Sequence, residues 1–187
     1  VGFQGWIKLG FAKNGRVTAA DIFIVSDIGP NATGGDASSA GGAISMVYDP
    51  AAMRFRGIPV LTNTTPRGAQ RGPGQNQIAA VMAPIMDKAA KALKIDRVEI
   101  RKINSPNNET TVYADQRPVT SAYMKEALDK GAKMFDWQSK RHASKKDGNK
   151  VRGIGIGQGY HSAGTHGFDG LLRIAPDGKI HIHSGVG

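Results

Sequence analysis

The chain has 187 residues, enough for one ordinary domain or two small ones, and its 40% apolar content excludes a disordered polymer. The absence of cysteine excludes disulfides, thiolate zinc sites and cysteine-held iron–sulfur clusters within this sequence, and no apolar run has the length of a membrane span. The formal net charge of +10 is compatible with a nucleic acid, an anionic membrane surface or an anionic ligand as partner.

The first predicted elements form a β-hairpin. Residues 6–11 and 17–25 have strand composition, and Asn14-Gly15 between them is the preferred pair for a tight two-residue turn. The small-residue segment 29–42 is expected to be a loop, either mobile or closely approached by another backbone. Residues 53–61 predict a third strand.

A helical middle follows. Apolar residues fall on one face over residues 78–93, where Pro84 is expected to kink or split the helix. Residues 95–104 predict a second helical piece, and residues 120–137 a third, amphipathic helix. Residues 139–150 carry many charges and are expected to form a linker.

After the linker the hydrophobic period changes to two. Residues 151–160 alternate like a strand, and residues 168–184 predict a second hairpin that turns at Asp177-Gly178. The predicted fold class is therefore α+β, with strand hairpins flanking a helical middle. The sequence starts at Val1 and stops soon after a predicted strand, so we interpret it as an internal piece of a longer protein.

The loop of residues 65–77, TPRGAQRGPGQNQ, directly precedes the helix predicted over residues 78–93 and contains no acidic residue. Its glycines allow backbone N–H groups to point inward together, and the start of the following helix adds partial positive charge. Arg71 can donate two parallel hydrogen bonds to an oxyanion. The loop predicts a site for a large, anionic, oxygen-rich ligand; a basic surface loop at a helix start is the alternative.

The order of these features resembles the molybdenum-binding subunit of the xanthine dehydrogenase and aldehyde oxidase family. The segments that carry the resemblance are IKLGFAKNGRVTAADIFIVSDIG, Arg56-Gly57, Thr62-Asn63, RGPGQNQIAA, EIRKIN, and the stretch RGIGIGQGY with the last hairpin. The resemblance implies that residues 1–104 end a first molybdenum-cofactor-binding domain. Residues 105–150 would be a helical connection and charged linker, and residues 151–187 would start a second such domain.

The activity implied by the resemblance is that of a molybdenum hydroxylase, which oxidises an aldehyde or an N-heterocyclic or aromatic substrate with oxygen from water. The cofactor would be molybdenum–pyranopterin, as molybdopterin or its cytosine dinucleotide. The remainder of the subunit would be one partner, and iron–sulfur clusters and possibly FAD would lie on partner domains or subunits. The family's catalytic glutamate is expected beyond Gly187, so this piece alone should be inactive. A cytoplasmic location is favoured, with periplasmic export left open.

Carried over to this sequence, the resemblance implies that Gln70, Arg71, Gly72 and Gly74 contact the cofactor. Purine-oxidising members have an aromatic residue after the Arg-Gly pair, whereas Pro73 occupies that position here. We therefore expect Pro73 to line a substrate pocket that is not a flat purine slot.

Two residues near the C-terminal strands are further candidates for the substrate pocket. Tyr160 would align with an aromatic residue that the family places over the substrate, and His161 with its polar neighbour; packing of Tyr160 in the core is the alternative. His181 and His183 share one predicted strand face but have no evident third ligand, so no metal ligands are expected within the chain.

The basic run KRHASKKDGNKVR, residues 140–152, supports an alternative function. A basic, non-catalytic nucleic-acid-binding domain would contact phosphates through these side chains. Only Trp137 stands nearby for stacking on bases, however, so a solvated linker is the preferred explanation of the run.

Overall fold

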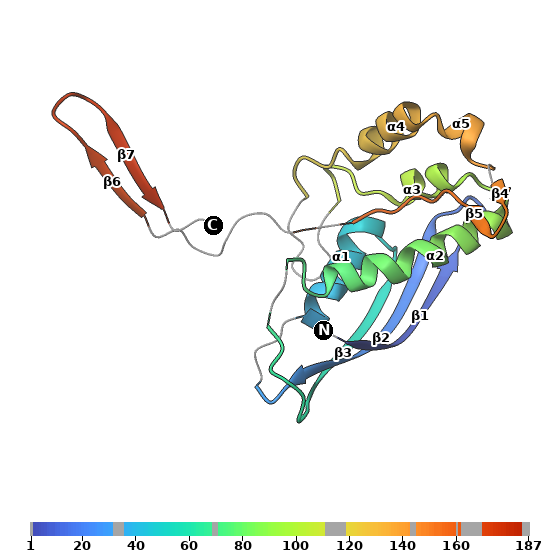
Figure 1. The fold of residues 1–187 in the computed structure, drawn as a ribbon, viewed down its shortest axis with the longest axis horizontal. Coiled ribbons are helices and arrows are strands. Elements are labelled where there is room, and N and C mark those ends of the chain that lie inside the picture. Colours follow the sequence, from blue (N-terminus) through green and yellow to red (C-terminus); the bar gives the residue numbers. More distant parts are fainter. Residues whose placement is uncertain are drawn as a thin grey trace.

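A computed structural model describes residues 2–31, 36–68, 71–110, 119–142, 145–159, 161 and 170–184. A three-stranded sheet of order β1-β2-β3 forms the base of the fold, and the helices lie on one of its faces (Figure 1). The predicted α+β class is confirmed. Inward residues of β2 and apolar residues of the helices make the main core, which includes Ile22, Ile44, Met82, Met86 and Ile100.

Strands β1 (Phe3–Phe11) and β2 (Val17–Gly29) form the predicted antiparallel hairpin. Its turn is longer than the two residues that we expected. The amide of Ala12 donates to the carbonyl of Arg16, and Gly15 is the residue with positive φ, at 89°. A two-residue turn of the type favoured by Asn-Gly needs positive φ at both central residues, so the chain uses a three-residue loop ending in a left-handed glycine instead.

Helix α1 (Asp36–Tyr48) replaces much of the predicted loop 29–42, so that prediction was wrong for its second half. A ring atom of Phe55 would lie 3.0 Å from a Cβ placed on Gly41, and the Cβ of Ala37 would lie 2.8 Å from one placed on Gly57. The small residues therefore let the helix lie directly on the sheet. Close backbone approach, one of the two explanations offered for this composition, is correct.

Strand β3 (Met53–Leu61) has the predicted bounds and runs parallel to β2. Parallel neighbours need a crossover connection, and α1 provides it, so β2, α1 and β3 make a β-α-β unit. As a result, β2 and β3 end at the same edge of the sheet (Figure 1).

Helix α2 (Gln75–Leu93) continues through Pro84 as one 19-residue element, so of the two expected effects the split does not occur and the kink stays a prediction. Pro84 is exposed, so the hydrogen bond that proline cannot donate is missing on the solvent side. Helix α3 (Arg97–Asn104) confirms the second helical prediction. It is capped by Asp96, whose carboxylate accepts from the amides of Val98 and Glu99.

Two buried polar residues of α3 hold the fold together. The fully buried guanidinium of Arg101 pairs with Asp87 at 2.8 Å and donates to the carbonyls of Arg97, Ala83 and Ile156. The buried side chain of Asn104 accepts a hydrogen bond through Oδ1 from the backbone N–H of Val17 at 2.7 Å. Its Nδ2 donates to the backbone carbonyl of Gly15 at 2.8 Å. Helix α3 is thereby tied to α2, to the first hairpin and to the segment near residue 156.

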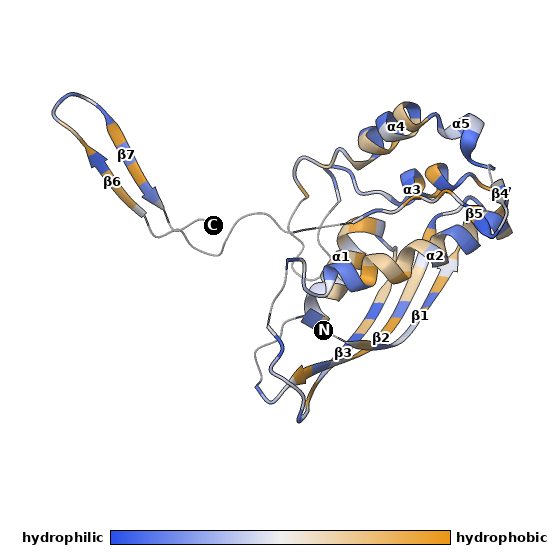
Figure 2. Ribbon diagram, viewed as in Figure 1, coloured by the Kyte–Doolittle hydropathy of each residue, from blue (hydrophilic) through white to orange (hydrophobic). Residues whose placement is uncertain are grey.

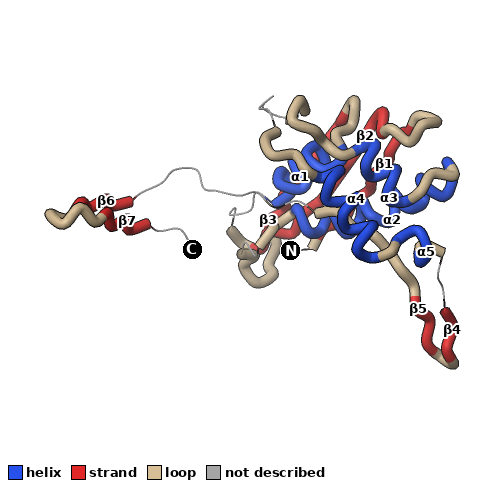
Figure 3. The backbone as a smooth tube through the Cα atoms, turned by 90° about the horizontal axis from the view of Figure 1, so that it is seen from above, coloured by secondary structure: helices blue, strands red, loops and turns tan. Residues whose placement is uncertain are grey.

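The region predicted as helix and linker contains more structure than expected. Helices α4 (Met124–Phe135) and α5 (Trp137–Lys140) precede a short hairpin of β4 (Lys145–Asp147) and β5 (Lys150–Arg152), which lies beside α5 (Figure 3). Trp137 is only 3% exposed and packs with Val98 and Leu128 in a second apolar cluster. The secondary structure within residues 139–150 was not expected, and the linker role of this segment stays a prediction.

The C-terminal part agrees only partly with expectation. Residues 153–159 have no regular secondary structure, although a strand was predicted there. Strands β6 (Gly170–Ile174) and β7 (Ile180–Ser184) form the predicted hairpin, whose loop again ends in a left-handed glycine, Gly178. Apolar and polar residues alternate along β7 (Figure 2), and the strand pairing puts Leu172, Ile174, Ile180 and Ile182, all exposed, on one face. Among the described residues, no helix is long and apolar enough to cross a bilayer.

Candidate functional site

The parallel pair β2–β3 defines a candidate binding edge. Each strand leads into a connection that starts a helix, so α1 and α2 both begin beyond the carboxyl ends of these strands (Figure 1). Ligands of α/β units bind at such edges, where the helix N-termini carry partial positive charge. We call residues 27–29, 36–40, 62–68 and 71–77 the carboxyl edge.

The starts of α1 and α2 are in direct contact. A Cβ on Gly74 would lie 1.9 Å from the carbonyl oxygen of Asp36 and 3.0 Å from the amide nitrogen of Ala40. Gly74 also has a φ of 77°, and Gly72 one of 72°. Both glycines are therefore required by the chain's own backbone, whether or not a ligand approaches them as well.

The segment after Arg71 is held in shape by Asn76, whose side-chain amide donates to the carbonyl of Arg71 at 2.8 Å. The Arg71 side chain is exposed and has no polar partner among the described residues. Gln75 and Gln77 follow at the start of α2, and the side-chain oxygen of each is buried without a partner in the described part of the chain. Buried polar atoms are normally hydrogen-bonded, so these two acceptors are available to a donor that the described residues do not supply.

These residues suit a ligand that presents both N–H groups and anionic oxygens. The unpaired glutamine oxygens would accept from N–H groups, and the Arg71 guanidinium would donate to a phosphate. A pyranopterin carries both kinds of group, so the donor set fits the cofactor implied by the sequence resemblance.

Asp27 also belongs to the carboxyl edge, and the sequence analysis gave it no role. Its carboxylate accepts from Thr62 Oγ1 at 2.6 Å, from Arg67 at 2.8 Å, from the amide of Gly29 at 3.0 Å and from Thr64 Oγ1 at 3.2 Å. The bonds from Thr62, Arg67 and Gly29 hold its pKa far below the ordinary value. A single acid on the outer face of a strand has no distinctive sequence pattern, which is why this role was missed.

Three further predicted site residues are Gln70, Tyr160 and His161. Gln70 and Tyr160 lie outside the described residues. His161 is exposed and lines a cavity with Met46, Val47 and Tyr123, near the C-terminal end of α1. None of residues 71–74 lines that cavity. The structure thus brings Arg71 to Gly74 together, and the pocket roles of Tyr160 and His161 stay predictions.

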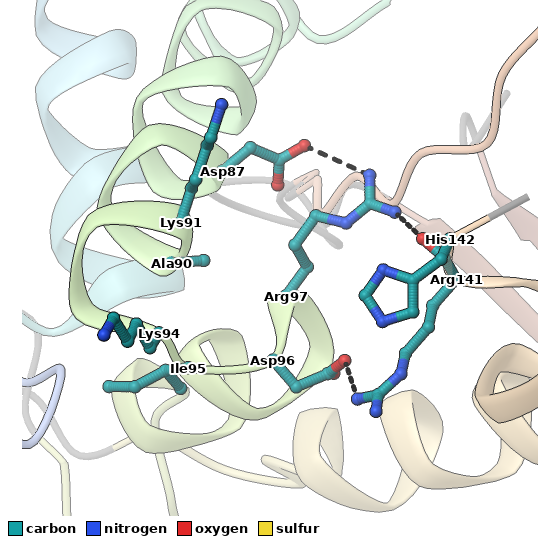
Figure 4. Close-up of a pocket in the computed structure, with 9 residues that line it drawn as sticks. All are labelled: Asp87, Ala90, Lys91, Lys94, Ile95, Asp96, Arg97, Arg141 and His142. Carbon is teal, nitrogen blue, oxygen red and sulfur yellow. Dashed lines mark hydrogen bonds and ion pairs between the residues drawn. The ribbon is translucent and has the colours of Figure 1, made fainter. Parts of the chain in front are cut away.

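A second cavity of about 640 Å³ lies between the end of α2, the start of α3 and His142 (Figure 4). The acid Asp96 accepts from the Trp137 indole and from Arg141, and Arg97 donates to the carbonyls of Ile154 and Arg141. Since these charges are paired within the chain, we interpret the region as a structural joint. The buried indole of Trp137 is also unable to stack on a nucleic acid base.

The comparisons with known proteins agree with this geometry. Residues 1–105 match the molybdopterin cofactor-binding domain family. The sequence is 29% identical to the putative xanthine dehydrogenase molybdenum-binding subunit XdhA of Escherichia coli (strain K12), over 96% of this chain and 25% of that protein. The nucleic-acid-binding alternative finds no support in these matches.

Two solved structures share the fold. The aldehyde oxidoreductase from Desulfovibrio gigas superposes with a TM-score of 0.79 and 25% identity, over 97% of this chain and 20% of that one. Quinoline 2-oxidoreductase from Pseudomonas putida 86 gives a TM-score of 0.63 and 25% identity, over 74% of this chain and 19% of that one.

This chain spans about a quarter of the length of the curated relatives it matches. The matched residues 1–105 contain β1 to α3 and therefore the whole carboxyl edge. The resemblance predicted from the sequence is confirmed, and the chain belongs to the molybdopterin cofactor-binding domain family of xanthine dehydrogenases and aldehyde oxidoreductases.

Proposed function

We propose that this chain is part of a molybdenum hydroxylase and that its carboxyl edge binds the molybdenum–pyranopterin cofactor. When bound, the cofactor supplies the two-electron oxidation of an aldehyde carbon or of a ring carbon next to nitrogen, with oxygen from water. The contribution of this chain is to seat and orient the cofactor. The catalytic base would belong to another part of the subunit, beyond Gly187, as the family pattern implies.

The contact between Gly74 and Asp36 is the observation that carries the proposal. It places the starts of two helices against each other, directly beyond the ends of β2 and β3. Their partial positive charges add to that of the exposed Arg71, and the buried Gln75 oxygen awaits a donor. The helix starts and Arg71 would attract the anionic phosphate of the pterin cofactor. The Gln75 oxygen would accept a hydrogen bond from a pterin N–H group.

The substrate that we propose is an aldehyde or an N-heterocycle other than a purine. Pro73, half-buried directly after Arg71 and Gly72, has no flat ring on which a purine could stack. Tyr160 and His161 would lie over the substrate, as the family pattern implies. The named activities of the structural relatives, an aldehyde oxidoreductase and a quinoline 2-oxidoreductase, are in line with this substrate range.

The proposed partners are the remainder of the molybdenum subunit and proteins or domains that carry iron–sulfur clusters and possibly FAD. They would take the electrons that the cofactor receives. We favour a cytoplasmic complex. Purification of the native complex, followed by assays for iron, labile sulfide and flavin, would test the proposed partners directly.

The cofactor seat is tested by Arg71→Ala in the complete subunit within its native complex. We expect molybdenum content or turnover to fall by about tenfold or more, because a charge-assisted bidentate contact is lost. Arg152→Ala is the matched control, since Arg152 is an exposed arginine on β5, away from the carboxyl edge. Wild-type molybdenum content and rate in Arg71→Ala would remove the assignment.

The substrate proposal is tested separately. The purified complex is offered an aliphatic aldehyde, an aromatic aldehyde, quinoline and xanthine under the same conditions. We expect kcat/KM for xanthine to be the lowest of the four. A preference for xanthine would contradict the pocket inferred from Pro73.

A further inference from the structure

Asp27 connects two parts of the carboxyl edge that are far apart in sequence. It is the third residue from the end of β2, and its partners Thr62, Thr64 and Arg67 come after the end of β3. Both carboxylate oxygens are used: one accepts from Thr62 and from the amide of Gly29, the other from Arg67, and Thr64 reaches both. One side chain therefore fastens most of the segment between β3 and Arg71.

The backbone of the same segment is fastened at Gly29. The amide of Thr62 donates to the carbonyl of Gly29 at 3.0 Å. Gly29 has a φ of 71°, and a Cβ there would lie 2.9 Å from the carbonyl oxygen of Thr65 and 3.0 Å from Cα of Pro66. The segment of residues 62–67 thus lies against the end of β2, a few residues before Arg71.

Of the two arginines in this region, Arg67 and Arg71, the Asp27 carboxylate pairs with Arg67. Arg67 is bound to Asp27 in an ion pair of 2.8 Å, with its side chain partly covered. Arg71, four residues later, is exposed and has no polar partner among the described residues. Asp27 therefore uses the positive charge of Arg67 for structure and leaves the charge of Arg71 available to a ligand.

We propose that Asp27 is a positioning residue of the cofactor seat: by holding residues 62–67 against the end of β2, it presets Arg71 and the start of α2 for the cofactor. This inference rests on the proposed function, because it assumes that the carboxyl edge is the seat. The inference adds Asp27 to the residues that influence cofactor binding. Asp27 would act through Thr62, Thr64 and Arg67, without contacting the cofactor.

The first test measures how firmly the segment is held. Trypsin cleaves after arginine, so the rate of cleavage after Arg67 and Arg71 in the cofactor-free complete subunit reports local opening of the loop. In Asp27→Asn the charge partner of Arg67 is lost, and we expect cleavage there to accelerate by about tenfold. Mass spectrometry of the peptides would assign the cleaved bonds, and the melting temperature would establish that the subunit is folded.

Asp21→Asn is the matched control. Asp21 lies on the same strand and pairs with an arginine of β3, Arg54, at 2.5 Å, but it is six residues away from the carboxyl edge. We expect it to leave the cleavage rate after Arg67 unchanged. Thr64→Val is a milder second variant, which removes one neutral donor to Asp27 without changing any charge, and we expect an intermediate rate.

The second test measures molybdenum and pterin per subunit in the native complex. We expect occupancy to fall by at least about threefold in Asp27→Asn and to stay at the wild-type level in Asp21→Asn, with kcat per bound molybdenum nearly unchanged in both. Arg71→Ala, run in parallel, separates the two proposals. Low occupancy in Arg71→Ala with wild-type occupancy in Asp27→Asn would overturn the role of Asp27 alone. Wild-type occupancy in both would overturn the cofactor seat, and with it this inference.

Discussion

Gly74 and Asp36 touch through their backbones, and no side chain fits between them. The distance of 1.9 Å from a Cβ on Gly74 to the Asp36 carbonyl oxygen is well inside van der Waals contact. This contact sets the position of α2 relative to α1, and so determines where the loop between β3 and α2 must end. The fold and the proposed cofactor seat therefore depend on the same glycine.

Gly74→Ala should destabilise the subunit by at least about 2 kcal/mol, because it adds a clash to an unfavourable left-handed conformation. Gly68→Ala is the control, since a Cβ on Gly68 meets nothing within 4 Å. Melting temperature and molybdenum content should both fall in the first variant and neither in the second. A stable Gly74→Ala subunit would show that α1 and α2 can separate without loss of the fold.

Arg101→Met should be among the most damaging single changes. It removes a fully buried guanidinium that makes one ion pair and three hydrogen bonds, and it leaves Asp87 with only the longer 3.8 Å pair to Arg97, which should cost about 3–5 kcal/mol. Lys102→Met, at the neighbouring but more exposed position, should cost less than about 1 kcal/mol. Urea denaturation of both variants, followed by hydrogen exchange in α2 and α3, would measure the difference in the free energy of unfolding. Equal losses of stability would contradict the role of Arg101 in holding α3 to α2.

Asp96 should make the joint at the start of α3 sensitive to acid. Burial alone would raise the pKa of Asp96, but hydrogen bonds from Trp137, Arg141 and the amides of Val98 and Glu99 lower it below 3.8. A carboxylate with a lowered pKa in the folded state stabilises the protein above its ordinary pKa, and this contribution is lost as the pH falls through the lowered value. The stability difference between wild type and Asp96→Asn should be constant from pH 7 to about pH 5 and shrink below 3.8. A difference that stays the same down to about pH 3 would contradict this linkage.

Pro84→Ala should stabilise α2. Pro84 is exposed in the helix interior, where alanine is a far better helix former, and we expect a gain of about 1–2 kcal/mol. Lys88→Ala, one turn later on the exposed side, should change stability by less than about 0.5 kcal/mol. A loss of stability in Pro84→Ala would mean that the shape of α2 at this residue is needed for its contacts with Arg101.

Elements with a clear hydrophobic period could be predicted from the sequence. Strand β3 was predicted with its observed bounds, and α3 to within a few residues, because strand-forming and helical patterns of apolar residues are evident in their sequences. Helix α1 was missed because glycine, alanine and serine have no such period, and only the contact with Phe55 shows why they form a helix. The β4–β5 hairpin was missed because its segment is rich in charges, and the side chains of β5 are all exposed.

The candidate site was predicted in part. The loop of residues 65–77 was identified from its glycines, its arginines and the helix that follows. The sequence could not show that Gly74 is required by Asp36, since the two residues are 38 positions apart and meet only through the β-α-β crossover. Asp27 was out of reach for the same reason: its partners are brought to it by the parallel pairing of β2 and β3.

The bond between the amide of Val17 and the side chain of Asn104 spans 87 residues. A ribosome that adds roughly 5–20 residues per second therefore takes roughly 4–17 s to deliver the partner of that amide. During this interval the amide of Val17 and the carbonyl of Gly15, although already synthesised, have only water in place of Asn104. We infer that the nascent sheet becomes fully ordered only once α3 has emerged, and that a pause in translation before residue 104 would prolong exposure of β1 and β2 to chaperones and proteases.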